Sequence, residues 1–165
     1  MLDLKLSYEA SRNRTYNQEI SRNRYTFEGS CIGSQLGSDA DRVILMGEWW
    51  VSGDMQASLG VSHMRDGEGD LFAEWDTPWI DPENPDSVLD YQEPFPSGIV
   101  EGTTTFFTGV EGNILKNLNY SLTAEYRLYS NKNNIKGQSD SDFYLGINLM
   151  WDFAIGIDNV LTYGN

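Results

Sequence analysis

The residues of this sequence best suited to chemistry are two tryptophans in an acidic stretch, Trp75 and Trp79. Asp76 and Asp81 lie beside them, and Tyr91 follows in the same stretch. Aromatic faces combined with carboxylates are typical of carbohydrate binding, because rings stack on sugar faces while carboxylates accept hydrogen bonds from hydroxyls. We therefore predict that these five residues contact a sugar. The alternative is that the rings pin the stretch to the mouth of the protein without touching a ligand.

Enzymatic chemistry has little support in the residue pattern. Glycoside hydrolysis needs two carboxyl groups placed across the scissile bond, and Glu74 and Asp76 form a candidate pair. In a chain with 25 acidic residues, such pairs arise by chance. His63 is the single histidine and has no cysteine near it in the sequence, so nothing indicates zinc or nucleophilic chemistry. We therefore predict no catalytic residue and no enzymatic activity.

Two groups of charged residues could bind ions or phosphates. Asp66, Glu68 and Asp70 alternate with glycines and could supply oxygen ligands to Ca²⁺, but the full pattern of a calcium loop is missing. A solvated acidic turn is the favoured interpretation, so we predict no metal and no cofactor. Four arginines could clamp acidic sugars or lipopolysaccharide phosphates, with a solvated or lumen-lining role as the favoured alternative: Arg12, Arg14, Arg22 and Arg24.

The charge and composition of the chain exclude one class of partner and favour one class of fold. Its 165 residues carry a formal net charge of −14, whereas nucleic-acid phosphates require patches of Lys and Arg. Hydrophobic residues make up 39% of the chain and aromatic residues 13%, against a hydrophobic share of roughly 45–50% in globular domains. Few aliphatic and many aromatic residues favour an all-β protein with a polar interior. Cys31 is the single cysteine, which excludes an internal disulfide framework.

The elements that would position these residues are strands with two different faces. Residues 143–153, FYLGINLMWDF, alternate strictly between large apolar side chains and polar or smaller ones, which is the period of a strand. Aromatic residues stand at both ends with aliphatic residues between them, as in a strand that crosses a bilayer between two aromatic girdles. The length suits a spanning strand of roughly 9–11 residues. A strand of an ordinary sandwich is the alternative.

Five further strands show a similar period. They cover residues 2–11, 43–51, 55–62, 103–111 and 118–129. The side chains expected to face lipid include Leu122, Leu145 and Leu149. Those expected to face the lumen include Ser121, Glu125, Arg127 and Asn148. In the turn after the second strand we expect Gly53 to supply a positive φ.

Long and short connections alternate between these strands. The long loops are 12–41, 66–101 and 130–141, and the short ones are 52–54 and 113–117. Because outer-membrane barrels have long extracellular loops and short periplasmic turns, all three long loops would lie outside the cell. Loop 66–101 holds all five prolines and eleven carboxylates but no Lys or Arg, and its aromatic residues favour an ordered surface.

The predicted fold is therefore all-β, with about six antiparallel up-and-down transmembrane strands that belong to a larger barrel. Six strands are too few to close, since small barrels start at about eight. Residues 1–165 would form a single segment of that barrel. An exported barrel needs a signal peptide, and none precedes Leu2, so we expect this segment to be the C-terminal piece of a longer precursor.

Residues 16–42 carry the features of a known family. They are Tyr25-x-Phe27 before a glycine, the pair Ile32-Gly33, and Leu36-Gly37 followed by Asp39 and Asp41. Three further segments follow in the same order as in that family: RDGE at 65–68, PSG at 96–98 and VE at 100–101. In these features the chain resembles the C-terminal third of the capsule-assembly Wzi-like family of outer-membrane proteins, over about residues 16–153.

This resemblance implies a large barrel in the outer membrane of a Gram-negative cell that helps to retain or assemble capsular or other surface polysaccharide. The expected partners are that polysaccharide, outer-membrane lipid and the remaining strands of the barrel, with no nucleic acid. A structural or transport barrel, acting as a pore or scaffold subunit without sugar recognition, is the alternative.

Overall fold

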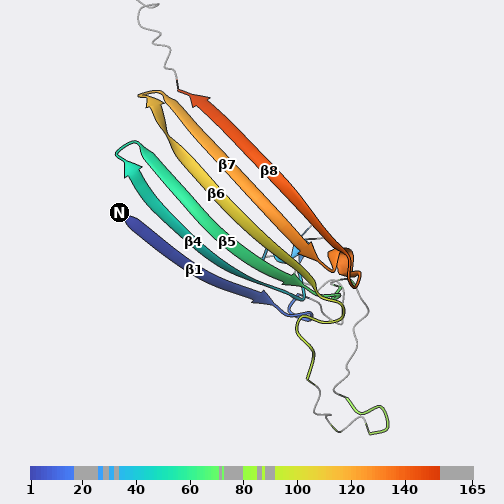
Figure 1. The fold of residues 1–165 in the computed structure, drawn as a ribbon. Helices are drawn as coiled ribbons and strands as arrows, with labels where there is room; N and C mark the ends of the chain where they lie inside the picture. The colour runs from blue at the N-terminus through green and yellow to red at the C-terminus, as the bar shows by residue number, and fades with distance from the viewer. Residues whose placement is uncertain are drawn as a thin grey trace, which may run out of the picture.

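Six long antiparallel strands form one sheet in the described part of the chain. A computed structural model describes residues 1–16, 26–27, 30–31, 34–70, 72, 80–84, 87 and 92–152. The strands lie side by side in the order β1-β4-β5-β6-β7-β8 (Figure 1). Their bounds are β1 Leu2–Ser11, β4 Ala40–Ser52, β5 Met55–Asp66, β6 Glu101–Leu115, β7 Leu118–Ser130 and β8 Ser139–Trp151. The predicted all-β, up-and-down arrangement is confirmed.

Two very short strands form a separate hairpin between β1 and β4 in the chain. These are β2 (Thr26–Phe27) and β3 (Ser30–Cys31), which pair antiparallel with each other. None of the described residues forms a helix long and apolar enough to cross a membrane.

The long strands extend further into the loops than predicted. β4 begins at Ala40, β5 ends at Asp66 and β6 begins at Glu101, so loops 12–41 and 66–101 are shorter than expected. The sequence places these residues in loops because segment 12–41 lacks a sustained alternation and segment 66–101 is acidic and rich in proline. They nevertheless pair in register, since a carboxylate and a guanidinium placed opposite each other across two strands compensate one another.

The last strand is shifted from its predicted position for the same reason. The expected strand 143–153 instead begins at Ser139, because the polar residues 139–142 pair with the end of β7. Phe153 lies outside the described residues. The loop before β8 is rich in asparagine, and it includes the 3₁₀ turn η2 (Lys132–Asn134). Positive φ angles suit asparagine and glycine, and four such residues adopt them here: Asn131, Asn133, Asn134 and Gly137.

The turn between β4 and β5 falls where it was predicted, but the prediction of a positive φ at Gly53 was wrong. A register shift between Trp50 and Ser52 marks a bulge just before the turn. A bulge bends its strand and increases the local twist, so the reversal here does not depend on a left-handed residue.

One face of the sheet is apolar across all six strands. A single cross-strand row illustrates this face, with members that pair in the order Leu6, Leu45, Val61, Phe106, Tyr126 and Phe143. The adjacent row points to the other face and pairs in the order Ser7, Ile44, Ser62, Thr105, Arg127 and Asp142. The predicted division into two faces is confirmed, since strand alternation places the two predicted sets of side chains on opposite sides.

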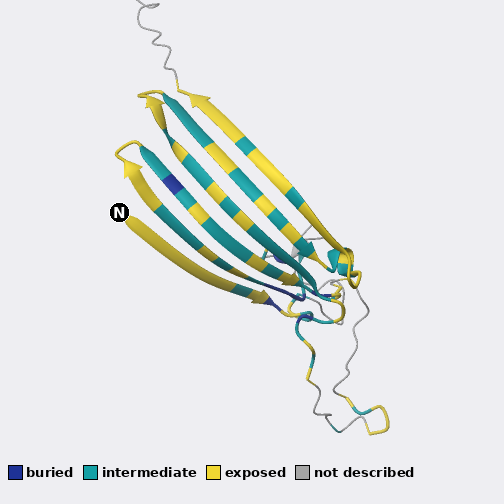
Figure 2. Cartoon of the chain, in the orientation of Figure 1, coloured by how far each residue is buried: buried dark blue, intermediate teal, exposed yellow. Residues whose placement is uncertain are grey.

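The sheet has almost no protein core. Among the described residues, the buried hydrophobic side chains are Leu36, Ala40 and Ala57, and Figure 2 shows strands that are mostly exposed or intermediate along their length. Leu4 is 72% exposed and Leu145 is 66% exposed. The apolar face of this chain is therefore open, and it is not covered by a second layer of described residues.

Candidate functional site

The long connections meet at one end of the sheet and the short turns lie at the other (Figure 1). We call the former the loop end and the latter the turn end. At the loop end, segments 38–41, 65–70, 93–101 and 131–134 come together through the hydrogen bonds described below. This loop layer holds both described ends of the acidic loop.

Asp39 lies at the centre of the loop layer. It is fully buried and adopts a left-handed backbone conformation with φ 61°. Its Oδ2 atom accepts hydrogen bonds from the backbone N–H of Gly69 at 3.0 Å, and from both the N–H, at 2.9 Å, and the hydroxyl of Ser97. Its backbone oxygen accepts from the N–H of Gly67 at 2.9 Å. One carboxylate thus joins the start of the acidic loop to its end.

Glycines make this close approach possible. A Cβ atom on Gly67 would collide with the carboxylate of Asp39, and one on Gly69 would collide with the Cβ of Asp39 and the amide of Asn13. Gly98 has φ 66°, and a Cβ there would run into the carboxylate of Glu68. Gly67 and Gly69 are therefore required by the close contact between the loops, and Gly98 by its positive φ.

An ion pair lies just outside the apolar part of the sheet. The guanidinium of Arg65 donates to both carboxylate oxygens of Asp41, with Nε to Oδ1 at 2.9 Å. The hydroxyl of Tyr8 donates to Oδ2 of Asp41 at 3.1 Å. Because Ala10, Asp41 and Arg65 share one cross-strand row on the apolar side of the sheet, this ion pair marks where that side becomes polar.

Asp66 follows Arg65 and lies beyond this boundary, in the loop layer. Burial of its carboxyl group, together with the negative charges of Glu101 and Asp39, raises the pKa of Asp66 to about 6. Like charges held close together disfavour ionisation of each other. The loop layer therefore stores electrostatic repulsion at neutral pH.

The loop between β7 and β8 closes this layer from the other side. The side-chain amide of Asn134 donates to the backbone oxygen of Ile99 at 2.7 Å and to that of Asp66 at 3.2 Å. The amide of Asn131 donates to the oxygen of Val100 at 3.0 Å, and the backbone N–H of Asn133 donates to the carboxylate of Glu101. These bonds satisfy backbone groups at the base of the acidic loop.

Two of the four predicted arginines hold the far end of the acidic loop. The guanidinium of Arg14 lies 3.5 Å from the carboxylate of Glu93, which also accepts from the amide of Asn13 at 3.1 Å. The guanidinium of Arg12 lies over the ring of Phe95, 5.8 Å from its centre. Both arginines thus have partners within the chain, a role that differs from both the phosphate clamp and the solvated or lumen-lining role considered for them. Arg22 and Arg24 lie outside the described residues.

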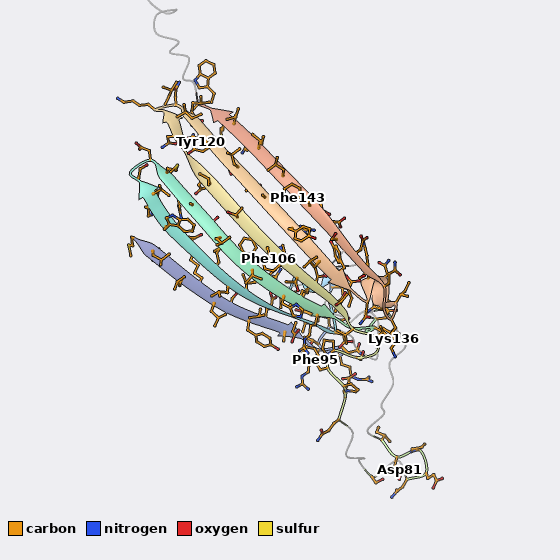
Figure 3. The ribbon with its side chains drawn as sticks, in the orientation of Figure 1. Asp81, Phe95, Phe106, Tyr120, Lys136 and Phe143 are labelled. Carbon is orange, nitrogen blue, oxygen red and sulfur yellow. The ribbon has the colours of Figure 1, made fainter. Side chains whose placement is uncertain are left out.

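Of the five predicted sugar-binding residues, only Asp81 is described. Its carboxylate accepts from the N–H of Glu83 at 2.9 Å and from the hydroxyl of Ser87 at 3.4 Å, so it stabilises a local turn. Figure 3 places Asp81 away from the strands, beyond Phe95 and the loop end. The other four lie outside the described residues: Trp75, Trp79, Asp76 and Tyr91.

Two residues considered as metal ligands, Asp70 and His63, form hydrogen bonds within the chain. A carboxylate oxygen of Asp70 accepts from the N–H of Phe72 at 2.8 Å, which forms a local turn. The ring of His63 shares a hydrogen bond of 2.9 Å with the hydroxyl of Thr104. Within the described ranges, no three His, Cys, Asp or Glu residues are placed so that they could hold a metal ion.

Comparison of the chain with protein-family models, with curated proteins and with solved structures found no match. The resemblance to the Wzi-like family therefore stays a prediction.

The central residue of the loop layer was not among the predicted site residues. In the sequence, Asp39 stands out only as one position of the pattern shared with the Wzi-like family. The signal that could have found it was the spacing of Gly67, Gly69 and Gly98, because glycines beside acidic residues in two distant segments indicate that two backbones approach closely. Sequence spacing alone does not reveal which third residue lies between them.

Proposed function

We propose that this chain is a segment of an outer-membrane β-barrel that helps to retain or assemble surface polysaccharide and is not an enzyme. The observation that carries the proposal is the continuous exposed apolar face of the sheet. Contiguous apolar patches beyond a few hundred Å² are rare on soluble monomers and mark contacts with membranes or proteins. Burying each exposed Leu or Phe in lipid contributes about 1.5–3 kcal/mol.

The height of the apolar face supports a membrane rather than a partner protein. On β7 this face runs from Leu118 to Leu128, and its ten residue steps of about 3.4 Å give about 34 Å along the strand. With a tilt of about 40° this corresponds to a height of about 26 Å, close to the band of about 25 Å on outer-membrane barrels. Tyr8 and its partners Asp41 and Arg65 stand at the loop-end border, where an aromatic girdle is expected.

The charges on the opposite face support a watery lumen. The ammonium group of Lys5 lies 2.6 Å from the carboxylate of Glu48, and the guanidinium of Arg127 lies 2.6 Å from that of Glu125. Charged pairs are costly in an apolar core but not beside water. The polar face therefore suits the interior of a wide barrel better than the core of a sandwich.

Polysaccharide retention is the part of the proposal that depends on the loop end. The acidic loop is anchored at both described ends by Asp39, Arg14 and Asn134, which hold these two ends at the loop end of the sheet. The residues of this loop predicted to bind sugars, together with the family resemblance, favour a surface saccharide as its partner.

A structural or transport barrel is the second candidate, favoured by one observation. The carboxylate of Asp81, which we predicted to contact sugar, is occupied by the turn 81–87. A loop whose polar groups are satisfied internally can act as a plug or a rim.

Replacing Trp75 and Trp79 together by Ala separates the two candidates. If both rings grip polysaccharide, each contributes on the order of 1 kcal/mol, so surface retention in intact cells should weaken roughly tenfold or more. Ile80→Ala in the same loop is the matched control and should leave retention unchanged. Undiminished surface polysaccharide in cells with normal levels of the double variant would favour the structural or transport barrel.

A further inference from the structure

A groove of about 490 Å³ lies at the turn end of the sheet. This volume falls within the range of small-molecule sites, about 300–1,000 Å³. One cross-strand row on the polar face runs along its floor, from β4 to β8, and its members pair in the order Trp50, Gln56, Glu111, Ser121 and Asn148. The groove therefore crosses five neighbouring strands.

The next row toward the loop end deepens the groove because its members on β5, β6 and β7 are small. A second hollow of about 120 Å³ is lined there by Ser58, Gly109 and Thr123, with Glu48 on β4 beside them. It shares Gln56, Glu111 and Ser121 with the first. The hydroxyl of Ser58 would lie 2.8 Å from a Cβ on Gly109. The side chain of Ser58 thus lies over Gly109, and the side chains of this row rise only a short distance above the sheet.

The lining combines an aromatic face with groups that both donate and accept hydrogen bonds. Trp50 is 54% exposed although it points to the polar face, so more than half of its surface is open to a ligand. Gln56, Ser121 and Asn148 supply amide and hydroxyl groups, and Glu111 supplies a carboxylate. An aromatic ring can stack on the C–H face of a sugar, while amides, hydroxyls and a carboxylate bond to its hydroxyl groups. This combination of groups is the chemistry that recognises a saccharide.

The charge of the lining selects against an acidic ligand. Glu111 and Asp54 line the groove, and no Lys or Arg is among its described lining residues. The basic groups on the strands of the same face are engaged by carboxylates, Lys5 with Glu48, Arg42 with Glu9 and Arg127 with Glu125. An anionic sugar would therefore meet uncompensated negative charge.

The length of the row fits a chain rather than a single sugar. Neighbouring strands lie about 4.8 Å apart, so five strands span about 19 Å. From these observations we propose that the turn end of the polar face binds an extended, neutral oligosaccharide stretch across the strands, with Trp50 as the stacking ring. This inference rests on the proposed function, because it assumes that the polar face lines the lumen of a barrel.

The groove is separate from the acidic loop. Tyr120, at its rim, lies at the turn end in Figure 3, whereas Phe95 and Lys136 lie at the loop end. In the proposed orientation a saccharide at the side of the short turns would contact the groove. A saccharide at the opposite side would contact the long loops. The two sites can therefore be tested independently.

The adjacent tryptophans provide a matched pair of variants. Trp49 and Trp50 are neighbours on opposite faces of β4, so Trp50→Ala removes the stacking ring and Trp49→Ala removes one of the same size from the apolar face. The chain is extracted from outer membranes into detergent together with the strands that close the barrel. It is titrated calorimetrically with maltohexaose, isomaltohexaose, cellohexaose and mannohexaose, and with hexagalacturonate as the acidic probe. Each variant must retain the strand signal in circular dichroism. Asn148→Ala replaces Trp50→Ala if the latter fails this check.

We expect at least one neutral hexasaccharide to bind the wild-type chain, with hexagalacturonate binding at least about tenfold more weakly. Trp50→Ala should weaken the neutral ligand about tenfold, the equivalent of about 1.4 kcal/mol, and Trp49→Ala should change its affinity less than twofold. Glu111→Gln should strengthen hexagalacturonate binding selectively. No binding of any neutral probe, equal losses in both tryptophan variants, or a preference for the acidic probe would overturn the inference. Surface retention that still depends on Trp75 and Trp79 would then leave the proposed function standing.

Discussion

The backbone N–H of Ser97 donates a hydrogen bond of 2.9 Å to the carboxylate of Asp39, a residue 58 positions earlier in the chain. Because Asp39 is fully buried, its carboxylate is shielded from water, and breaking this bond would remove one of the three donors that hold its Oδ2 atom. A hydrogen bond to a charged group contributes about 1.5–3 kcal/mol. The pair therefore sets the position of the acidic loop relative to the sheet.

Gly67 tests this arrangement, because it has no room for a side chain. Gly67→Ala would place a Cβ against the carboxylate of Asp39 and the backbone nitrogen of Ser97, so the loop layer must shift. Hydrogen exchange at Gly69 and Ser97 should speed up at least about tenfold, while exchange in β7 stays the same. Gly53→Ala is the control, since nothing lies within 4 Å of a Cβ there, and it should leave both rates unchanged. Unaltered protection in the Gly67 variant would contradict the central role of Asp39.

The raised pKa of Asp66 predicts a pH dependence of the loop layer. The pKa is about 6 in the folded protein, above the ordinary value of 3.8, so the folded state binds the proton more tightly than the unfolded state. The loop layer should therefore be most stable below about pH 4 with respect to this group and lose that stability as the pH rises through 6. Amide exchange rates at Gly67 and Glu68, corrected for intrinsic pH effects, provide the measurement.

Asp66→Asn should remove this dependence between pH 4 and 7 and slow exchange at pH 7. The backbone oxygen of residue 66, which accepts from Asn134, is kept in this variant. Asp54→Asn, in an exposed turn at the other end, serves as the control. A pH profile that persists in the Asp66 variant would assign the effect to another group.

The two outer strands of the sheet predict how the isolated chain behaves. β1 and β8 are the ends of the strand order, so each presents a row of backbone N–H and C=O groups that lipid cannot satisfy. Extracted alone into detergent, the chain should form oligomers or broad assemblies by light scattering, and it should need further strands to close. A monodisperse, heat-resistant monomer would be inconsistent with an open edge on each side.

The fold could be predicted to the extent that it depends on local periodicity. Alternation in 118–129 and 143–153 identifies both the strands and their faces. A shift of one residue would move all the apolar side chains of a strand to the polar face. The borders could not be predicted, since Asp41 and Asp66 look like loop residues until their pairing across strands is known.

The sites were harder to predict because they depend on contacts between distant segments. Prediction from the sequence favoured Trp75 and Trp79, which stand out by type. It passed over Trp50, whose position on the polar side of a strand was visible in the alternation but acquires meaning only through its cross-strand partners Gln56 and Asn148. Asp39 became important only when three loops met around it.

The most direct test of the outer-membrane proposal is the accessibility of the two faces in intact membranes. Single cysteines are introduced at Ser121, Glu125 and Asn148 on the polar face and at Leu122, Leu145 and Leu149 on the apolar face, in a chain in which Cys31 is replaced by Ser. Outer-membrane vesicles are then treated with a water-soluble maleimide. We expect rapid labelling of the three polar-face cysteines, and labelling of the three apolar-face cysteines at least about tenfold more slowly, because thiolates react in water and not in lipid. Faster labelling of the apolar-face set would contradict the assignment of that face to the membrane.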